Sequence, residues 1–240
     1  MYVSETVAKS YRPNFVLGSE GKDERDARHR VIYNCIDVEH IRSVVRQALQ
    51  HPAPNWKVGS LVLLSVGRLV PEKGHGTVIA ALPDLVRLHP GLKYVILGEG
   101  PNRDALLQQA KSLGVAKHLE LPGWVDHDEA IRQMVAADAV VMPSHSVQEG
   151  FGLALAEAML CETPIIASRV PVFEEVAGGE SAVLRFFTEG DPQALAEQAQ
   201  GILTCLSEPK DFQPLVDRVT QRFDVQRMAQ AYAELYQQLL

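Results

Sequence analysis

The stretch EGFGLALAE, residues 149–157, joins a strand-like run to a helical run. The apolar run AVVMPS (139–144) precedes it, and the run LALAEAML (153–160) contains its second half. A buried strand, a loop with glycines and a helix are the parts of one strand-to-helix unit of a parallel sheet. The stretch therefore predicts such a unit, with Glu149 in the loop and Glu157 on the helix.

The same alternation of strand-like and helical runs extends from residue 61 to the C-terminus. Apolar runs of strand length without polar alternation suit strands that are buried on both faces of a parallel sheet. We therefore predict an α/β fold with a doubly wound parallel sheet, Rossmann-like, built from right-handed βαβ units. The predicted strands are 61–67, 93–98, 118–123, 139–144 and 164–168, with a weaker helix–strand unit at 173–186. The predicted helices are 76–89, 102–114, 126–137, 152–160, 192–206 and 226–240. In the third of these, Asp126 is a candidate N-cap and Glu129 completes a capping-box spacing.

The first 50 residues lack this regular alternation. The charge-dense stretch 18–30 is interpreted as a solvated loop, and the Pro-rich stretch HPAPN (51–55) as a break before the regular part. The other predicted elements here are the end of a helix at 3–10, a short strand at 30–34 and a helix at 38–50.

Composition and charge narrow the class of protein. With 240 residues, 46% hydrophobic and 22% charged, the chain is typical of a soluble globular protein. Its net charge of -7 gives no general electrostatic support for binding nucleic acid or anionic lipid. No apolar run approaches the roughly 20 residues that a membrane span needs, so we expect no transmembrane segment. The cysteines Cys35, Cys161 and Cys205 form no CxxC pair, which favours reduced thiols and a cytoplasmic protein.

Ligands of doubly wound sheets bind beyond the C-terminal ends of the strands, so the strand-to-helix turns are the candidate sites. The first turn, GRLVPEKG (67–74), contains Arg68 and Lys73. Arg offers phosphate oxygens a planar fork of donors and Lys offers a point charge, which predicts an anion site. The alternative is two solvated surface cations.

Two further turns carry weaker signals. The turn GEGPNRD (98–104) begins like the dinucleotide fingerprint G-x-G-x-x-G, but Arg103 replaces the third glycine, so we interpret it as a plain tight turn. In the turn PGWVDHD (122–128), Trp124 is interpreted as a packed aromatic, and the backbone near Val125 could face a flat base.

The fourth turn holds the opening stretch. The first amides of the helix that starts near Gly152 lack helical partners and lie at the positive end of its dipole, which suits an anion. If the segment is helical, Glu149 and Glu157 lie about 12 Å apart, which is too far for a close acid–base pair. We predict a sugar at one end, a ribose at the other, and a diphosphate between them on the amides, Arg68 and Lys73. The alternative is a solvated Glu149 and a capping or salt-bridging Glu157.

Four segments follow one another along the chain in this order: GRLVPEKG, ILGEGP, LPGWV and PSHSVQEGFGLALAEAM. Together they resemble the C-terminal, donor-binding domain of the retaining GT-B glycosyltransferases of the glycosyl transferase group 1 family. YNCID (33–37) resembles the segment that enters this domain, and VPVFEEVAGGESAVL (170–184) resembles a segment of mannosyltransferase-like members. The resemblance implies that residues 1–50 are a remnant of the N-terminal domain and a linker. It implies that residues 51–240 are a Rossmann-like nucleotide-sugar-binding domain, the C-terminal half of a GT-B fold.

The resemblance also implies a role for each site residue. The implied catalytic residues are Arg68 and Lys73, which would bind the donor diphosphate and stabilise the leaving group, and Glu149, which would hold hydroxyls of the donor sugar. Glu157 would hold the ribose hydroxyls. The other implied substrate-binding residues are Gly67, Val125 near the base, and Gly150, Phe151, Gly152 and Leu153, whose amides would contact phosphate and sugar. No metal and no cofactor is implied, since the cations and the helix end would neutralise the developing charge.

Two positions depart from the family pattern. Cys35 stands where the N-G-[VI]-D segment usually has glycine. Glu162 stands where the A-x-G-x-P turn, here LCETP, usually has glycine. If that turn needs a left-handed residue, Glu162 costs roughly 1 kcal/mol there.

The acceptor-binding N-terminal domain of the family is not recognised in this sequence, and three hypotheses remain. The chain is the donor half of a transferase that works with a separate acceptor-domain subunit, a nucleotide-sugar-binding protein without transferase activity, or a fragment of a longer enzyme. The sequence is compatible with either a UDP-sugar or a GDP-sugar as the donor. The last helix carries an apolar stripe that needs a surface to pack on, which favours a partner subunit or a homo-oligomer. The stripe consists of Met228, Tyr232, Leu235, Tyr236 and Leu239.

Overall fold

The computed structural model describes residues 1–11, 22–23, 26–50, 60–145 and 149–238. The strands are β1 (Lys22–Asp23), β2 (Asp26–Arg30), β3 (Val62–Val66), β4 (Lys93–Leu97), β5 (Leu119–Gly123), β6 (Ala139–Met142), β7 (Ile165–Ser168) and β8 (Leu184–Phe187). The helices are α1 (Glu5–Tyr11), α2 (Val38–Gln50), α3 (His75–Leu88), α4 (Arg103–Ser112), α5 (His127–Ala136), α6 (Leu153–Leu160), α7 (Pro171–Ala177), α8 (Pro192–Thr204), α9 (Gln213–Arg222) and α10 (Val225–Gln237).

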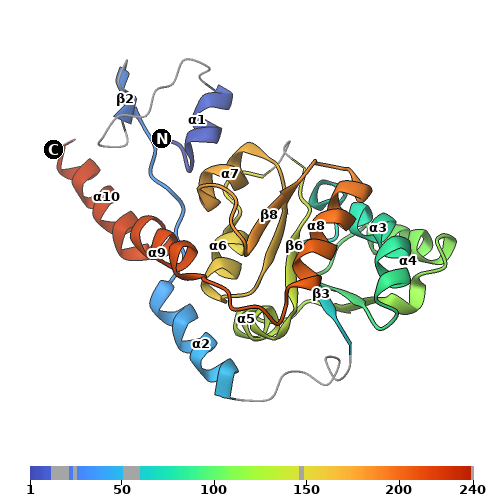
Figure 1. The fold of residues 1–240 in the computed structure, drawn as a ribbon. Coiled ribbons are helices and arrows are strands. Elements are labelled where there is room, and N and C mark those ends of the chain that lie inside the picture. Colours follow the sequence, from blue (N-terminus) through green and yellow to red (C-terminus); the bar gives the residue numbers. More distant parts are fainter. Residues whose placement is uncertain (12–21, 24–25, 51–59, 146–148, 239–240) are drawn as a thin grey trace.

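A six-stranded parallel sheet forms the centre of the molecule (Figure 1). In space its strands follow the order β5-β4-β3-β6-β7-β8. The chain therefore builds one half of the sheet outward from β3, returns to the middle, and builds the other half outward from β6. This is the strand order of the Rossmann fold, so the predicted doubly wound parallel sheet is confirmed.

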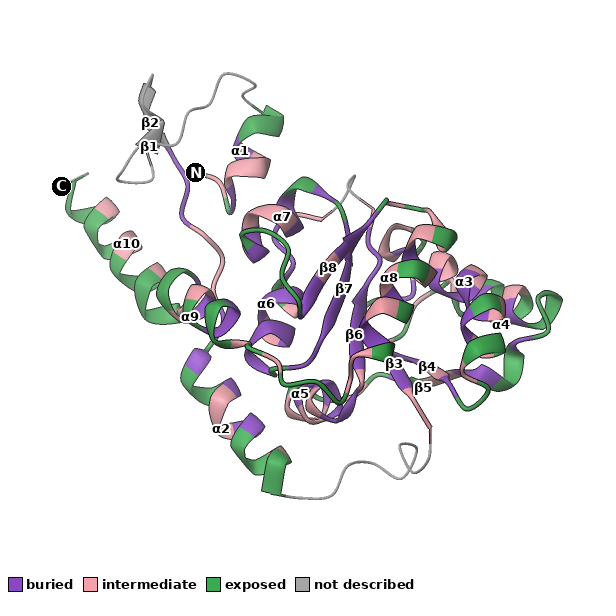
Figure 2. Cartoon of the chain, in the orientation of Figure 1, coloured by how far each residue is buried: buried purple, intermediate pink, exposed green. Residues whose placement is uncertain are grey.

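Helices cover both faces of this sheet, and successive residues of a strand point to opposite faces. Leu63 of β3 packs in a core with α3, α4 and α8. Its neighbours Val62 and Leu64 pack in the other core, with α2, α5, α6, α7 and α9. Figure 2 shows the strands buried between the two helical layers. The strands are apolar throughout because both of their faces are covered.

Several local predictions are confirmed in detail. The helix predicted at 38–50 is α2, with the same bounds. Asp126 caps α5, and its carboxylate accepts a hydrogen bond from the amide of Glu129 at 2.8 Å. Glu162 has a φ of 54°, the one positive φ among the described residues other than glycines. The left-handed turn that the family pattern implies is therefore kept, although this chain has no glycine there.

Other local predictions are wrong. The stretch 18–30 is not a loop in its described part, because β1 and β2 pair as an antiparallel two-stranded sheet. Antiparallel pairing lets two charged segments satisfy each other's backbone groups without any apolar core. The strand predicted at 30–34 is reduced to a single bridge between Val31 and Tyr2. Helix α9 was not predicted, although its short apolar stripe is buried. The Pro-rich break at 51–55 and Leu239 lie outside the described residues.

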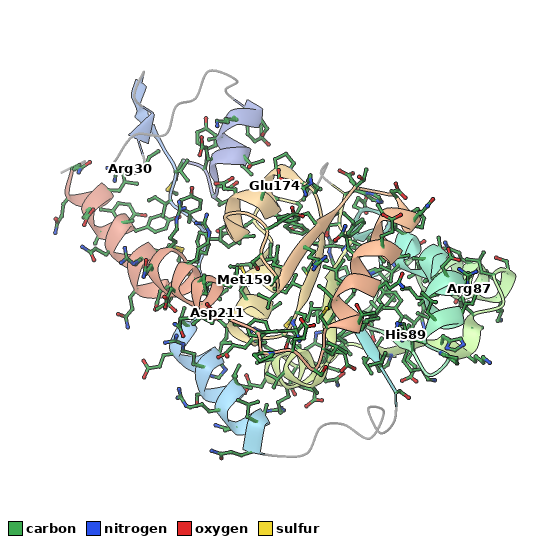
Figure 3. The ribbon with its side chains drawn as sticks, viewed as in Figure 1. Arg30, Arg87, His89, Met159, Glu174 and Asp211 are labelled. Atoms are coloured by element: carbon green, nitrogen blue, oxygen red, sulfur yellow. The ribbon has the colours of Figure 1, made fainter. Side chains whose placement is uncertain are left out.

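The N-terminal segment lies beside the last two helices. The amide of Ile36 donates to the carbonyl of Phe223 at 2.8 Å, and the amide of Val225 donates to the carbonyl of Ile36 at 3.0 Å. Figure 3 labels Arg30, whose guanidinium donates to Gln238 near the end of α10 at 3.2 Å. Helix α2 packs in the same core as α5 and α6, while the division of the chain at residue 50 stays a prediction.

None of the described helices combines the length and the apolar character that crossing a bilayer requires. The three cysteines, Cys35, Cys161 and Cys205, are all free thiols, in agreement with the reduced state expected from their spacing. Burial raises the pKa of the Cys161 thiol, so this group stays protonated in the core.

Candidate donor-binding cleft

The C-terminal ends of β3 and β6 lie side by side at the point where the strand order reverses. Such a switch point opens a crevice that ligands of α/β sheets occupy. Here it opens into a cleft of 460 Å³. The cleft is lined by every predicted site residue except Val125: Gly67, Arg68, Lys73, Glu149, Gly150, Phe151, Gly152, Leu153 and Glu157. Residues that are far apart in the sequence are thus brought together.

A second pocket of 440 Å³ adjoins the first and contains Val125. Gly67, Arg68 and Glu157 line both pockets, so the two form one extended cleft. We call its two parts the Glu149 end and the Val125 end. Glu149 lies before α6, which begins at Leu153, so the helical spacing assumed for the two glutamates holds only from Leu153 onward.

The turn after β3 holds Lys73 against the loop after β6. Lys73 ends a short 3-10 turn, and Gly74 then starts α3 with a φ of 66°. A Cβ atom at Gly74 would lie 1.9 Å from the carbonyl oxygen of Pro143, so only glycine fits. This close approach of two backbones fixes the distance between the two loops of the cleft.

Buried hydrogen bonds support the same turn from below. The Ser65 hydroxyl donates to the carbonyl of Val141 at 2.6 Å, and the Tyr94 hydroxyl donates to Ser65 at 3.0 Å. His75 continues the chain, with Nδ1 at 3.1 Å from the Tyr94 hydroxyl and Nε2 at 3.3 Å from the carbonyl oxygen of Arg68. Sequence reasoning missed this chain, because its members come from three strands and a helix start.

His75 is neutral at neutral pH. Burial lowers the pKa of its imidazole to about 4, and the nearby Lys73 also lowers it. A neutral ring can stay buried under the cleft without a counter-ion, whereas an imidazolium there would add a desolvated charge. A neutral ring has a single N–H, so His75 donates either to the Tyr94 hydroxyl or to the Arg68 carbonyl, and it fills the space under this turn without a charge.

Glu149 and Lys73 form an ion pair across the cleft. Lys73 Nζ lies 2.7 Å from Glu149 Oε2, and the two side chains are 28% and 10% exposed. Arg68 is exposed, and no side chain among the described residues forms an ion pair with it. Arg68 therefore brings a charge that an anionic ligand can neutralise, while Lys73 holds the carboxylate in place.

Helix α6 starts at the floor of the cleft. Its N-cap, Gly152, has a φ of 85° and offers no capping side chain. A Cβ atom there would lie 2.7 Å from the Phe173 ring, so the position requires glycine for two reasons. Phe151 turns its ring into the core, where it packs edge-on against Phe223 with centroids 5.1 Å apart. The loop is thus anchored by a side chain, and its backbone faces the cleft.

At the Val125 end, Glu157 accepts a hydrogen bond from His127 Nε2 at 2.9 Å. Its side chain is 15% exposed, and that of His127 is 52% exposed. The interpretation of Trp124 as a packed aromatic is wrong, because this residue is 73% exposed. It follows β5, which is an edge strand of the six-stranded sheet, so no neighbouring strand lies on its outer side among the described residues. The sequence alone does not distinguish an exposed aromatic ring at the rim of a pocket from an aromatic ring in the core.

One group of potential metal ligands occurs among the described residues, made of His40, His127 and Asp128. None of the three lines the Glu149 end of the cleft. The part of the site that would face a diphosphate thus depends on Arg68, Lys73 and the start of α6.

The fold is Rossmann-like, and its cleft lies at the switch point of the sheet, where domains of this kind bind ligands. The family model described as "Glycosyl transferases group 1" matches residues 47–214. The chain belongs to this family. The resemblance found in the sequence motifs is therefore confirmed at the level of the family.

A relative and two solved structures illustrate the similarity. The glycogen synthase of Mycobacterium tuberculosis (strain CDC 1551 / Oshkosh) is 37% identical over 185 residues, which cover 75% of this chain and 43% of that protein. Anabaena HepE, solved in complex with UDP and glucose, superposes with a TM-score of 0.68 at 28% identity, over 87% of this chain and 56% of that one. The fold also matches sucrose-phosphate synthase from Thermosynechococcus elongatus, with a TM-score of 0.76 at 23% identity, over 99% of this chain and 57% of that one.

The chain spans about half the length of these relatives, between 43% and 57%. The activity of a whole enzyme therefore does not transfer directly from them to this chain.

Proposed function

We propose that the chain is the donor-binding domain of a retaining glycosyltransferase, which transfers a sugar from a nucleotide-diphosphate sugar to an acceptor. One observation carries the proposal: two cations, two carboxylates and a helix start meet in a single cleft at the switch point. The sugar is a hexose in this proposal, and the enzyme is of the mannosyltransferase-like type.

Each group then has a role along the extended ligand. The diphosphate lies between Arg68, Lys73 and the amides of residues 150–153, which lead into α6, with Gly67 beside it. Fixed positive groups in that place stabilise the negative charge that develops on the diphosphate as it leaves the sugar. Glu149 holds sugar hydroxyls at one end.

The nucleoside occupies the other end. Glu157 accepts hydrogen bonds from the ribose hydroxyls, after its bond to His127 has opened. The base lies over the backbone near Val125. The exposed Trp124 ring stands at the same rim, where an aromatic face suits stacking on a base.

The donor base is either uracil or guanine in this proposal. The similarity to HepE, solved with UDP and glucose, supports a UDP-sugar. The segment 170–184, which resembles mannosyltransferase-like members, supports a GDP-sugar.

Sugar transfer also needs a second protein surface that closes the cleft. Donor and acceptor must be held in register in a closed cleft that excludes water, and in the described residues the cleft at the switch point of the six-stranded sheet is open. We propose that this second surface comes from a separate acceptor-domain subunit, from a second copy of the chain, or from further sequence of a longer enzyme. No residue of α10 is buried, and Tyr236 on its stripe is 62% exposed, which supports association through this helix. The expectation of a cytoplasmic protein stays a prediction.

Calorimetry with UDP, GDP and ADP, with and without EDTA, tests the binding part of the proposal. At least one nucleotide should bind in the presence of EDTA, because protein cations occupy the place of a metal. Arg68→Ala should weaken that binding by roughly 1.5 to 3 kcal/mol. Arg87→Ala is the matched control, since Arg87 lies at the end of α3, away from the cleft (Figure 3). Binding that disappears on chelation, or that Arg68→Ala leaves intact, would contradict the assignment.

Light scattering and an acceptor assay test whether transfer requires a second protein surface. We expect a dimer or a complex with a co-purified chain, and transfer only in that complex. A monomer that turns over an acceptor without help would show that one domain suffices. Binding without transfer in every assembly would favour a non-catalytic nucleotide-sugar-binding subunit.

A further inference from the structure

Three metal-ligating side chains converge on the outer surface beside the Val125 end of the cleft. His40 belongs to the first turn of α2, and His127 and Asp128 are the first two residues of α5. One potential ligand atom of each of the three lies within 4.8 Å of those of the other two. We propose that His40, His127 and Asp128 form a binding site for a transition-metal ion of the Zn²⁺ class. The three ligands lie outside the diphosphate site, although Glu157, which contacts His127, is also the group proposed to hold the ribose.

The positions of the three residues are fixed by the packing of the two helices. Ile41 of α2 and Ile131 of α5 lie in the same core. Each helix start is also capped, since Asp37 accepts from the amide of His40 at 2.9 Å and Asp126 caps α5. The side chains therefore project from a rigid base, and a metal ion would not have to order two loops.

The donor set suits zinc. Two imidazoles and one carboxylate are three of the ligands that Zn²⁺ prefers, and a site with three protein ligands leaves the fourth position to water or an external ligand. Ligand atoms around tetrahedral zinc are about 3.3 Å apart, as Zn–N distances near 2.0 to 2.1 Å require. The side chains of His40 and Asp128 are 47% and 41% exposed, so they can make the small movement that closes the site.

The present contacts already prepare two of the ligands. His40 Nε2 lies 2.7 Å from Asp128 Oδ1, so a nitrogen and an oxygen ligand face each other. The rings of His40 and His127 lie nearly parallel, with centroids 6.4 Å apart and an interplanar angle of 18°. An ion between these groups would replace one exposed hydrogen bond with coordination bonds.

Glu157 supplies the outer contact that metal-binding histidines usually have. His127 Nε2 lies 2.9 Å from a carboxylate oxygen of Glu157. When the ring is neutral and donates this bond, its proton is on Nε2 and its lone pair is on Nδ1, free for an ion. A carboxylate in that position orients the ring and increases the basicity of the ligating nitrogen.

The test is a titration of the metal-free chain with Zn²⁺ by calorimetry and with Co²⁺ by visible absorption. We expect one ion per chain and the strong visible bands of four-coordinate Co²⁺. His40→Ala and Asp128→Asn should each weaken binding by more than about tenfold, since losing a ligand costs at least as much as losing an outer contact. Both side chains are exposed, so the variants should fold, and circular dichroism would check this.

His89→Ala is the matched control. His89 follows α3, on the other face of the sheet from α2 (Figure 3), and its loss should leave metal binding unchanged. Weak binding of several ions with no Co²⁺ bands would overturn the proposal. Binding that persists in both His40→Ala and Asp128→Asn would do the same, because the ion would then lie elsewhere.

Discussion

The two ends of the cleft use the same carboxylate chemistry in two environments. At the Glu149 end, the carboxylate is 10% exposed and faces a lysine, a group with a permanent charge at neutral pH. At the Val125 end, Glu157 faces His127, whose side chain is 52% exposed. The buried polar chain of Ser65, Tyr94 and His75 lies under the Glu149 end only.

This difference suits the two ends of the cleft to different tasks. A shielded ion pair on a supported turn keeps its geometry before the ligand arrives, which suits the reacting end of a donor. An exposed imidazole–carboxylate contact contributes little and opens easily, which suits the end that only holds a nucleoside. Four measurements test this difference between the two ends of the cleft, and they follow from the largest expected effect to the smallest.

The largest effect is expected for Lys73→Met. This change leaves the shielded Glu149 carboxylate without its partner, and breaking such a pair costs about 3 to 4 kcal/mol of unfolding free energy. Urea denaturation measures the cost. The double variant Lys73→Met/Glu149→Gln should recover most of it, because it removes the unpaired charge. A single variant as stable as the parent would show that the pair is effectively solvated.

The second effect is acid destabilisation through His75. The folded pKa of about 4 lies below the unfolded value of 6.5, so the unfolded chain binds more protons between these pH values. Stability from this group is therefore complete above pH 6.5 and falls as the pH drops to about 4, by about 3 kcal/mol in total. Unfolding free energies of the parent and of His75→Gln, measured from pH 7 to pH 4, should diverge by this amount. Parallel pH profiles would contradict the assignment.

The third effect separates the two glutamates by ligand. Glu157→Ala should weaken binding of UDP and UDP-glucose alike, or of GDP and GDP-mannose, by roughly 1.5 to 3 kcal/mol, since its partner is the ribose. Glu149→Ala should weaken only the nucleotide sugar. It should leave the free nucleotide as tight as before or tighter, because Lys73 is released toward the diphosphate. Equal losses for both ligands in both variants would show that the two ends are assigned wrongly.

The smallest effect is expected for His127→Asn. Nucleotide binding no longer has to open the contact with Glu157, so affinity should rise, but by less than about 1 kcal/mol because the contact is exposed. Calorimetry with the nucleotide that binds, in the presence of EDTA, measures this change. A loss of affinity larger than that of Glu157→Ala would reverse the comparison and make His127 the main nucleoside ligand.

Much of the fold follows from local pattern. The apolar runs that became β3, β4, β6 and β7 needed no partner to be recognised, because a strand covered on both faces is apolar along its whole length. The amphipathic spacing at 38–50 and the cap at Asp126 set two helices in the same local way. The family pattern usually has glycine where this chain has Glu162, and this position takes the left-handed conformation that favours glycine.

The failures share a cause. Trp124 looks like a core aromatic in the sequence, yet its exposure depends on β5 being an edge strand. The charged stretch that contains β1 and β2 looks like a loop, yet these two strands pair with each other. In both cases the decisive neighbour, or its absence, is a property of the assembled chain.

Local sequence patterns are enough to predict the alternation of strands and helices. They also place Arg68, Lys73 and Glu149 at strand-to-helix turns, and Glu157 on the helix that follows. Only the tertiary structure decided that β3 lies beside β6, and so that the first and fourth of these turns share a cleft. It also decided the partners of the two glutamates, Lys73 at a separation of 76 residues and His127 at a separation of 30. The physical reason is that periodicity and turn chemistry act over a few residues, whereas strand order and ion pairing depend on which distant surfaces pack together.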